Sequence, residues 1–272
     1  MPGRRDREAS PWALLVAATF LCAAQPAHSQ SAGEPARQSL TVTLGVAHDT
    51  RRDAADSPLA YSGSGPLARI GYERTREGRR LHVSFTAGGS TLTPSGTVPD
   101  AFTPFQEAFT IYALEAGMDW RLRGSSPRRG DFALGVEFGS TVTLARHLYA
   151  GQDISQQSFD LGVVTLGPSA RWTRRFGDGE VSASLAVPLL AWVDHPYADV
   201  RFATQLMKVH FAPFSRFHEA DGELSYSFRP GDRYGIEASY RLELVELNEL
   251  QVVRRASQSL TIAVVRRFGV RP

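Results

Sequence analysis

The sequence predicts an all-β fold, an up-and-down antiparallel transmembrane β-barrel of about ten strands. Apolar and polar side chains alternate through segments from Leu40 to Phe268, and a β-strand places successive side chains on opposite faces. The segments are long: residues 112–122 put Tyr, Leu, Ala, Met, Trp and Leu on one face, and a strand that crosses a bilayer needs roughly 9–11 residues. Tight turns also alternate with longer connections, which is the asymmetry expected of such barrels.

The N-terminal segment predicts export. An arginine-rich start (residues 4–7) precedes the apolar residues 12–24, and Ala-His-Ser follows at 27–29. This is the pattern of a cleaved secretory signal peptide, which we assign to residues 1–29. The apolar stretch is shorter than the roughly 20 residues of a spanning helix. We expect residues 30–38 to be a short lead-in and residues 39–272 to form one transmembrane β-barrel domain.

The composition fits a barrel although it looks like that of a soluble protein. The chain is 42% hydrophobic and has a formal net charge of +2. In a membrane barrel only alternate residues face lipid, so the average side chain is polar. The only cysteine, Cys22, lies within the predicted signal peptide. The mature chain is therefore expected to have no thiol chemistry.

Four tight turns and five longer connections separate the predicted strands. The tight turns are expected at residues 74–80, 123–130, 174–180 and 229–233. The longer connections are expected at residues 48–65, 90–108, 146–157, 194–219 and near Asn248. In outer-membrane-type barrels the tight turns lie in the periplasm and the longer loops outside, so we expect both ends of the barrel domain on the periplasmic side.

Periodicity assigns one face of each strand to lipid. The predicted lipid-facing residues are Leu40, Val42, Leu44, Val46, Ile70, Tyr72, Leu81, Val83, Phe85, Ala87, Phe132, Leu134, Val136, Phe138, Val142, Leu144, Val181, Leu185, Val187, Leu189, Val193, Leu224, Tyr226, Phe228, Tyr234, Ile236, Ala238, Tyr240, Leu242, Leu244, Leu260, Ile262, Val264 and Phe268. The sixth strand, about residues 159–172, changes phase near Val163 and Val164, which predicts a bulge there. An interfacial aromatic girdle is expected near strand ends, at Trp120, Trp172, Tyr234 and Phe268.

The opposite face of the strands carries charge. These residues form the predicted polar network of the lumen: Glu73, His82, Glu115, Asp119, Arg121, Glu137, Asp221, Glu223, Glu237 and Arg241. A water-soluble barrel of the lipocalin kind is the structural alternative, and its apolar side chains would point inward. So much inward charge is unfavourable in an apolar ligand cavity, whereas charges in a polar lumen can pair. The membrane barrel is therefore the favoured fold.

Positions equidistant from a tight turn face each other across a hairpin. Two ion pairs are expected on this basis: Glu73 with His82, and Asp221 with Arg241. The same reasoning brings together Glu115 and Glu137, which requires an arginine between them, a shared proton or water. A barrel of this size holds side chains and some water, and open channels are usual in larger barrels. We therefore favour a salt-bridged plug over a pore.

The mature chain resembles the outer-membrane β-barrel proteins of diderm bacteria from Leu40 to Val270. Its last strand, with apolar residues alternating from Leu260 to Phe268, is similar to the signal that the barrel-assembly machinery recognises, although residues 269–272 follow the aromatic residue. The resemblance implies export through the secretory pathway to the outer membrane. It also implies contact with outer-membrane lipid and lipopolysaccharide, and with the assembly machinery and periplasmic chaperones during biogenesis.

One enzymatic alternative is an omptin-like protease. Residues 192–196 (Trp-Val-Asp-His-Pro) are similar to a segment of the omptins, which use an Asp-His couple and a facing aspartate pair at the outer rim. Asp194 and His195 are adjacent here, so a strand would point them to opposite faces. Asp49 and Asp53 are the other acidic candidates. No catalytic residue is assigned, and Asp194 and His195 stay weak candidates.

A second enzymatic alternative is lipid modification. His82 and Ser84 have the His-x-Ser spacing of outer-membrane lipid deacylases. They follow a tight turn and point inward, where a lipid chain would not reach them. An ion pair between His82 and Glu73 is the favoured interpretation.

The connection at residues 194–219 is the most distinctive predicted surface feature. It combines basic and aromatic side chains: His195, Phe202, Lys208, His210, Phe211, Phe214, Arg216, Phe217 and His218. The histidines lack helical ligand spacing and an acidic partner pattern, so no metal site is predicted. Val200, Ala203, Leu206 and Met207 would form one face of a short amphipathic helix, acting as a lid or as an anchor to lipopolysaccharide.

Other sequence signatures are absent. The chain has no phosphate-binding glycine loop, no paired-cysteine motif and no basic-aromatic pattern of the nucleic-acid-binding type. We therefore expect no cofactor and no nucleic-acid partner. The predicted role is structural, adhesive or narrowly conductive. A surface-exposed hydrolase, either an omptin-like protease or a lipid-modifying enzyme, is the alternative.

Overall fold

The computed structural model describes residues 37–53, 59–97, 105–122, 130–148, 158–194, 210–231, 233–248 and 252–268. The predicted signal peptide lies outside the described residues, as do the lead-in up to residue 36 and the predicted helix at residues 200–207. No helix within the described ranges has the length and hydropathy needed to cross a bilayer.

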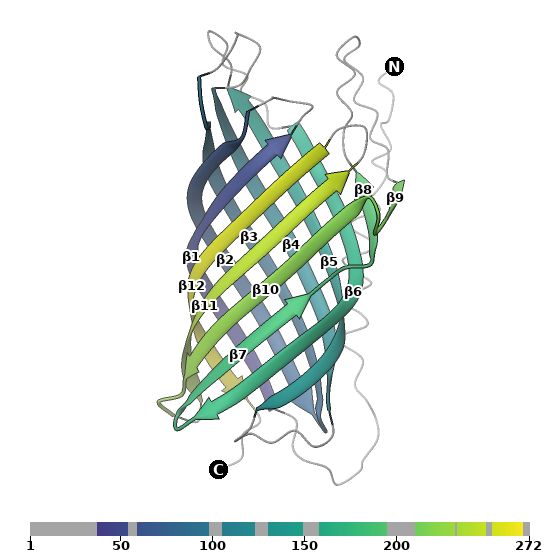
Figure 1. Cartoon of the computed structure of the whole chain (residues 1–272). Helices are drawn as coiled ribbons and strands as arrows, with labels where there is room; N and C mark the ends of the chain where they lie inside the picture. Colours follow the sequence, from purple (N-terminus) through teal and green to yellow (C-terminus); the bar gives the residue numbers. More distant parts are fainter. Residues whose placement is uncertain are drawn as a thin grey trace, which may run out of the picture. The chain divides into compact units, whose positions relative to one another are not determined.

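The described residues form one closed antiparallel sheet (Figure 1). Its segments are β1 (Arg37–Asp53), β2 (Tyr61–Arg76), β3 (Arg79–Pro94), β4 (Gln106–Arg121), β5 (Asp131–Leu148), β6 (Ser158–Phe176), β7 (Gly179–Ala186), β8 (Leu190–Asp194), β9 (His210–Pro213), β10 (Phe217–Phe228), β11 (Tyr234–Asn248) and β12 (Val252–Phe268). Neighbours along the chain pair with each other, except β7 with β8 and β9 with β10, and β1 pairs with β12, which closes the barrel.

Two barrel strands are interrupted. Both β7 and β8 pair with β6, and residues 187–189 separate them. In the next strand β9 pairs with β8 and β10 pairs with β7, with a turn at residues 214–216 between the two segments. The twelve segments therefore make a barrel of ten strands, and the predicted fold and strand number are confirmed.

The two ends of the barrel differ. We call the end with Arg37, Phe268 and the tight turns the turn end, and the end with Asp53 and Asp194 the loop end. At the turn end, residues 77–78 and 177–178 are two-residue hairpin turns. The φ angles of Glu77 and Gly78 are 51° and 75°, as in the type I′ turn that matches the twist of paired strands.

The strands extend further at the loop end than predicted. β1 continues to Asp53 and β2 begins at Tyr61, inside the connection expected at residues 48–65. Likewise β3 reaches Pro94 and β4 begins at Gln106. The outward face there is polar, so the apolar alternation stops, while the backbone hydrogen bonds between strands continue. Hydrophobic periodicity therefore found the apolar part of each strand and missed its polar extension.

Apolar side chains cover the outward face. The most exposed are Leu44, Leu260 and Ile262, at 67%, 66% and 65%. The strand register places the predicted lipid-facing residues on this face, with the exception of Val193. Exposed aromatic residues near the turn end include Trp120, Phe132, Phe176, Tyr234 and Phe268. A continuous apolar band of this kind requires an apolar surrounding.

β6 has a bulge, but not at the predicted position. The register of β5 against β6 shifts where Thr143 pairs with Leu161 and Leu144 with Phe159, so the extra residue is Asp160. Val163 and Val164 stay in phase, and Val163 faces the lumen among apolar side chains. Two consecutive valines therefore mark a place where both faces are apolar, not a change of phase.

A second irregularity explains Val193. β7 pairs with β6 up to Ala186, and β8 pairs with it from Leu190. The three residues 187–189 between these segments stand opposite only two residues of β6, 167–168. Pro188 lies within this bulge, and proline has no backbone N–H to donate. The extra residue reverses the alternation in β8, so Val193, predicted to face lipid, points into the lumen and is 0% exposed.

Candidate functional site in the barrel lumen

The inward face of the barrel carries a network of ion pairs. Near the turn end, the Arg80 guanidinium contacts both Glu73 and Asp119, each at 2.9 Å between N and O. Asp119 also accepts a hydrogen bond from Ser169 Oγ at 3.2 Å. These residues come from β2, β3, β4 and β6. The network therefore ties neighbouring strands together through their side chains.

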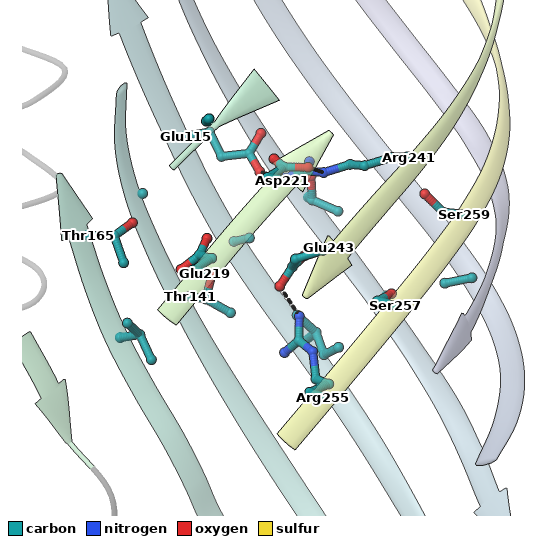
Figure 2. Close-up of a pocket in the computed structure, with 18 of the residues that line it drawn as sticks. Glu115, Thr141, Thr165, Glu219, Asp221, Arg241, Glu243, Arg255, Ser257 and Ser259 are labelled. Atoms are coloured by element: carbon teal, nitrogen blue, oxygen red, sulfur yellow. Dashed lines mark hydrogen bonds and ion pairs between the residues drawn. The ribbon is translucent and has the colours of Figure 1, made fainter. Parts of the chain in front are cut away.

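In the middle of the lumen, Arg241 joins opposite walls of the barrel (Figure 2). It forms ion pairs with Glu115 on β4 and Asp221 on β10, and its Nε donates to Asp221 Oδ1 at 2.7 Å. Ser84 Oγ also donates to Glu115, at 3.0 Å. Buried charges are tolerated when they are paired and hydrogen-bonded. The three-residue cluster is thus a bridge across the lumen.

Towards the loop end, Arg255 on β12 forms an ion pair with Glu243 on β11. Glu219, Glu243 and Arg255 line the cavity that is drawn in Figure 2. Within the described part of the chain, Glu219 accepts no side-chain hydrogen bond. In the other direction, Glu223 pairs with Arg69 at 3.2 Å.

The structure regroups the predicted pairs. Glu73 stands opposite His82 in the register, as expected. Its ion pair is with Arg80, so the predicted ion pair between Glu73 and His82 was wrong. His82 Nε2 lies 3.7 Å from Glu137 Oε1 instead. Glu115 and Glu137 do not stand opposite each other: Glu115 stands opposite Gly139, and Glu137 stands opposite Gly117.

The Asp221–Arg241 contact forms from a different register than expected. Asp221 stands opposite Glu243, and Arg241 stands opposite Glu223. The contact is therefore a diagonal one, two positions along the strand, which a long arginine side chain reaches easily. The last pair of the two strands is Phe228 with Ile236, so the connection between β10 and β11 is two residues longer than symmetric counting assumed.

Two predicted network residues are placed differently. Arg121 lies at the turn end with a side chain 44% exposed, where it pairs with Asp131 at 2.8 Å, so it belongs to the rim and not to the lumen. Glu237 faces the lumen and lines the turn-end cavity. Glu223 and Arg171 are among the charged groups that act on it electrostatically.

Sequence reasoning missed several cationic members of the network. They are Arg69, Arg80, Arg171 and Arg255. Each lies on the inward face of its strand, in step with the inward polar residues of that strand. Following the alternation through every arginine would have found them. Arg121 and Arg241 were the only arginines in the predicted network, so the arginine partners of Glu73, Asp119 and Glu223 were not named.

Three cavities follow one another along the lumen. The largest, about 240 Å³, lies in the turn-end half and has a largely polar wall. The next, about 80 Å³, lies beside the Arg241 bridge and is the one drawn in Figure 2. The third, about 30 Å³, lies towards the loop end and is lined by Phe109, Leu161 and Phe217 among others. The free space therefore narrows from the turn end to the loop end.

The loop-end lumen is filled by apolar side chains, which sequence reasoning did not predict. Two buried clusters, together called the apolar layer, consist of Leu161, Val163, Ala191, Val193, Ala212, Phe217, Val245, Leu247 and Val253, and of Tyr61, Leu92, Phe109 and Ala145. The Arg51 guanidinium stacks on the Phe109 ring at 4.7 Å. The signal was present as consecutive apolar residues such as 163–164, 191–193 and 252–253.

The described residues include only some of the weak catalytic candidates. Asp194 ends β8 and is 4% exposed, and His195 lies outside the described residues. Asp49 accepts a hydrogen bond from Ser90 Oγ at 2.8 Å, and Asp53 ends β1. Ser84 is engaged with Glu115. Among the described residues, no three His, Cys, Asp or Glu side chains form a group able to hold a metal ion.

Part of the connection at residues 194–219 is visible. Residues 210–213 form β9, and the Phe214 and His218 rings meet edge to face at 5.2 Å. Phe217, predicted in the loop, begins β10 and joins the apolar layer with 2% exposure.

Comparison with known proteins identifies the fold. No family model and no curated protein matches the sequence. Among solved structures, the outer-membrane protease OmpT of Escherichia coli is similar, with 7% identity, a TM-score of 0.54, and coverage of 89% of this chain and 99% of that one. Neisserial surface protein A gives 13% identity, a TM-score of 0.40, and coverage of 84% and 97%. The translocator domain of the autotransporter NalP from Neisseria meningitidis gives 11% identity, a TM-score of 0.45, and coverage of 94% and 96%.

These likenesses concern architecture, because the identities are low. The match to OmpT spans nearly the whole of both chains. It agrees with the ten-stranded ring found in the strand pairing. The chain has the closed antiparallel barrel fold of outer-membrane proteins.

Proposed function

We propose that this chain is an integral outer-membrane β-barrel protein of a diderm bacterium whose lumen is closed, and that it has a structural or adhesive role instead of conducting solutes. The observation that carries the proposal is the apolar layer. Lumen-facing side chains at the loop end, such as Val193, Phe217 and Leu247, are 0–2% exposed. A pore would leave side chains at this level in contact with water.

The outward band supports the membrane location. Leu44, Leu260 and Ile262 are each about two-thirds exposed, and burying a side chain of this size in an apolar phase contributes about 1.5–3 kcal/mol. The proposed orientation puts the turn end in the periplasm and the loop end outside, as in other barrels with this turn asymmetry. Phospholipid and lipopolysaccharide are then the immediate neighbours of the band.

Biogenesis would involve the barrel-assembly machinery and periplasmic chaperones. The last strand, β12, carries outward Leu260, Ile262 and Val264 and ends at the exposed Phe268. This is the segment proposed to bind the assembly machinery. Its pairing with β1 closes the barrel, so recognition of β12 and closure of the sheet involve the same strand.

The lumen closes in two ways. The Arg241 bridge spans the middle of the barrel, and the apolar layer fills the loop end. The cavity between the two halves of the layer is about 30 Å³, which is room for about two water molecules at roughly 10–15 Å³ of centre-accessible space each. A hydrated ion does not fit such a space.

Liposome swelling tests the proposal. The purified mature chain, reconstituted in liposomes, should leave them impermeable to a small sugar such as arabinose. A triple variant, Leu161→Ala and Phe217→Ala with Arg241→Ala, removes two large side chains that line the 30 Å³ cavity together with the bridge, and should allow swelling. Leu224→Ala with Phe228→Ala makes the same kind of change on the outward face and should not. Swelling with the unaltered chain would contradict the closed lumen.

A further inference from the structure

The turn-end cavity is the most accessible chamber in the lumen. It has a volume of about 240 Å³, and its lining includes Ser39, near the start of β1, and Arg229, which follows the end of β10. The cavity therefore extends to the barrel rim at the turn end. The Arg241 bridge and the apolar layer lie beyond its other end. A small molecule would enter it from the turn end.

Most charges around this cavity have a partner. Arg80 pairs with Glu73 and Asp119, and Arg229 pairs with Glu180 at 2.6 Å. Such pairing is what buried charges require, since an uncompensated one costs several kcal/mol.

Arg171 and Glu237 differ from these groups. Within the described residues, Arg171 forms no ion pair, and its guanidinium reaches only the hydroxyls of Thr173 and Ser182, both at 3.4 Å. Glu237 forms neither an ion pair nor a side-chain hydrogen bond in the same part of the chain. The two line one cavity from β6 and β11 and lie within electrostatic range of each other. A cation and an anion thus face the same space without meeting.

We propose that this cavity binds a small zwitterion, an amino-acid-like molecule whose carboxylate contacts Arg171 and whose ammonium group contacts Glu237. A guanidinium holds a carboxylate with two parallel hydrogen bonds. Hydroxyl groups of Ser182, Ser225 and Ser239 complete the wall. Ser182 Oγ lies 2.8 Å from Ser225 Oγ, and Ser239 Oγ lies 2.8 Å from Thr261 Oγ1 behind it in the sheet. These groups donate or accept as the ligand requires.

The opposite signs of the two groups select the ligand class. A simple anion would satisfy Arg171 and leave Glu237 facing added negative charge. A simple cation would do the reverse. A ligand with both charges satisfies both groups. Because a zwitterion has no net charge, its binding leaves the net charge of the lumen unchanged. The size also fits, because about 240 Å³ corresponds to more than ten water-sized positions at roughly 10–15 Å³ each.

The test compares a zwitterion with its two halves. Glycine, acetate and methylammonium are titrated separately into the refolded mature chain in detergent micelles, and binding is followed by saturation-transfer NMR. We expect glycine to bind about tenfold more tightly than either half. No glycine binding would overturn the proposal. Equal binding of acetate and glycine would also overturn it, because Glu237 would then take no part.

Substitutions locate the site. Arg171→Gln and Glu237→Gln should each lower glycine affinity by about tenfold. Arg254→Gln, on the outward face near the loop end with a side chain 61% exposed, should leave the affinity unchanged. Folding of each variant is checked by its shift in gel mobility on heating. Folded Arg171→Gln and Glu237→Gln proteins that bind glycine normally would exclude this cavity. The comparison of glycine with acetate and methylammonium uses the unaltered chain, so it tests the proposal even if a variant does not fold.

This inference is independent of the swelling assay. A closed lumen and an empty turn-end cavity would support the proposed function and refute the ligand. Glycine binding in a chain that lets arabinose through would do the opposite.

Discussion

The lumen has two regions built on the same strands, and side chains of opposite character occupy them. Towards the turn end and in the middle, the inward face of β4 carries Asp119 and Glu115, which are held by arginines. Further along the same face, at the loop end, β4 carries Phe109, which is 6% exposed. The alternation of the strand does not change between the two regions. The difference shows that strand geometry fixes which residues face inward, while their chemistry decides whether the lumen holds charge or is filled.

The energetics of the two regions follow from this chemistry. In the charged region each carboxylate depends on a specific partner, so removing one group leaves its partner uncompensated. In the apolar layer no single contact is essential, and stability comes from packing volume. Substitutions should therefore act through partners in one region and through cavity size in the other.

The largest effect is expected in the charged region. Arg241→Met removes the partner of both Glu115 and Asp221 and should lower the free energy of unfolding by about 3–5 kcal/mol. Urea unfolding in lipid vesicles measures the change. Adding Glu115→Gln and Asp221→Asn removes the uncompensated charges and should restore most of the loss. A triple variant as unstable as Arg241→Met would show that packing, and not pairing, holds this region.

The next effect concerns the apolar layer. Leu247 is 2% exposed, and Leu247→Ala should cost about 2–5 kcal/mol by leaving a cavity. Leu260→Ala removes the same atoms from the outward face, where Leu260 is 66% exposed, and should cost clearly less. Unfolding in vesicles compares the two. Similar losses at both positions would mean that the loop-end lumen is not a packed layer.

A third comparison contrasts the apolar band with the polar part of the outward face near the loop end. Ile262→Arg places a charge in the outward band and should cost about 2–4 kcal/mol near the bilayer midplane. Thr50→Arg, on the outward face near the loop end, should cost about 0–1 kcal/mol because it lies near or beyond the interface. Equal tolerance of arginine at both sites in vesicle unfolding would argue against the bilayer position proposed for the band.

The smallest effect tests the fit within the charged region. A Cβ added at Gly117 would lie 2.5 Å from His82 Cε1 and 3.1 Å from the Val136 carbonyl oxygen. Gly117→Ala should therefore cost about 1–3 kcal/mol and move His82 away from Glu137. His82→Ala in the same chain should relieve the contact with the ring. Gly222→Ala is the control, because its Cβ would lie 3.9 Å from the nearest atom. An equally large loss of stability in Gly222→Ala would show that the contact with His82 is not the cause.

Much of the fold could be predicted from the sequence, because alternation in segments such as residues 112–122 is a direct consequence of strand geometry. The two-residue turn at Glu77 and Gly78 lay inside a predicted turn. Pro188 and Asp160 escaped prediction because one extra residue in a strand changes the pairing without changing composition. The Val193 assignment was wrong for this reason. The ends of β1 and β2 were missed because polar residues continue the pairing beyond the apolar band.

The site was less predictable. The sequence placed Glu115 and Arg241 on the inward face, but it could not pair them, since β4 and β11 meet across the lumen and not along the sheet. Hairpin counting pairs only directly opposed residues, so it paired Glu73 with His82 and not with Arg80, which lies two positions along the same strand. The apolar layer was legible in residues 191–193 and 252–253. It was not recognised because an inward face was expected to be polar throughout.

The measurement that tests the closed lumen most directly is the single-channel conductance of the refolded mature chain in a planar bilayer. A chain that inserts, as shown by protease protection of the barrel, and gives no discrete current steps at either polarity is the predicted result. Discrete steps that scale with salt concentration would contradict it, because ions would then be passing both the Arg241 bridge and the apolar layer.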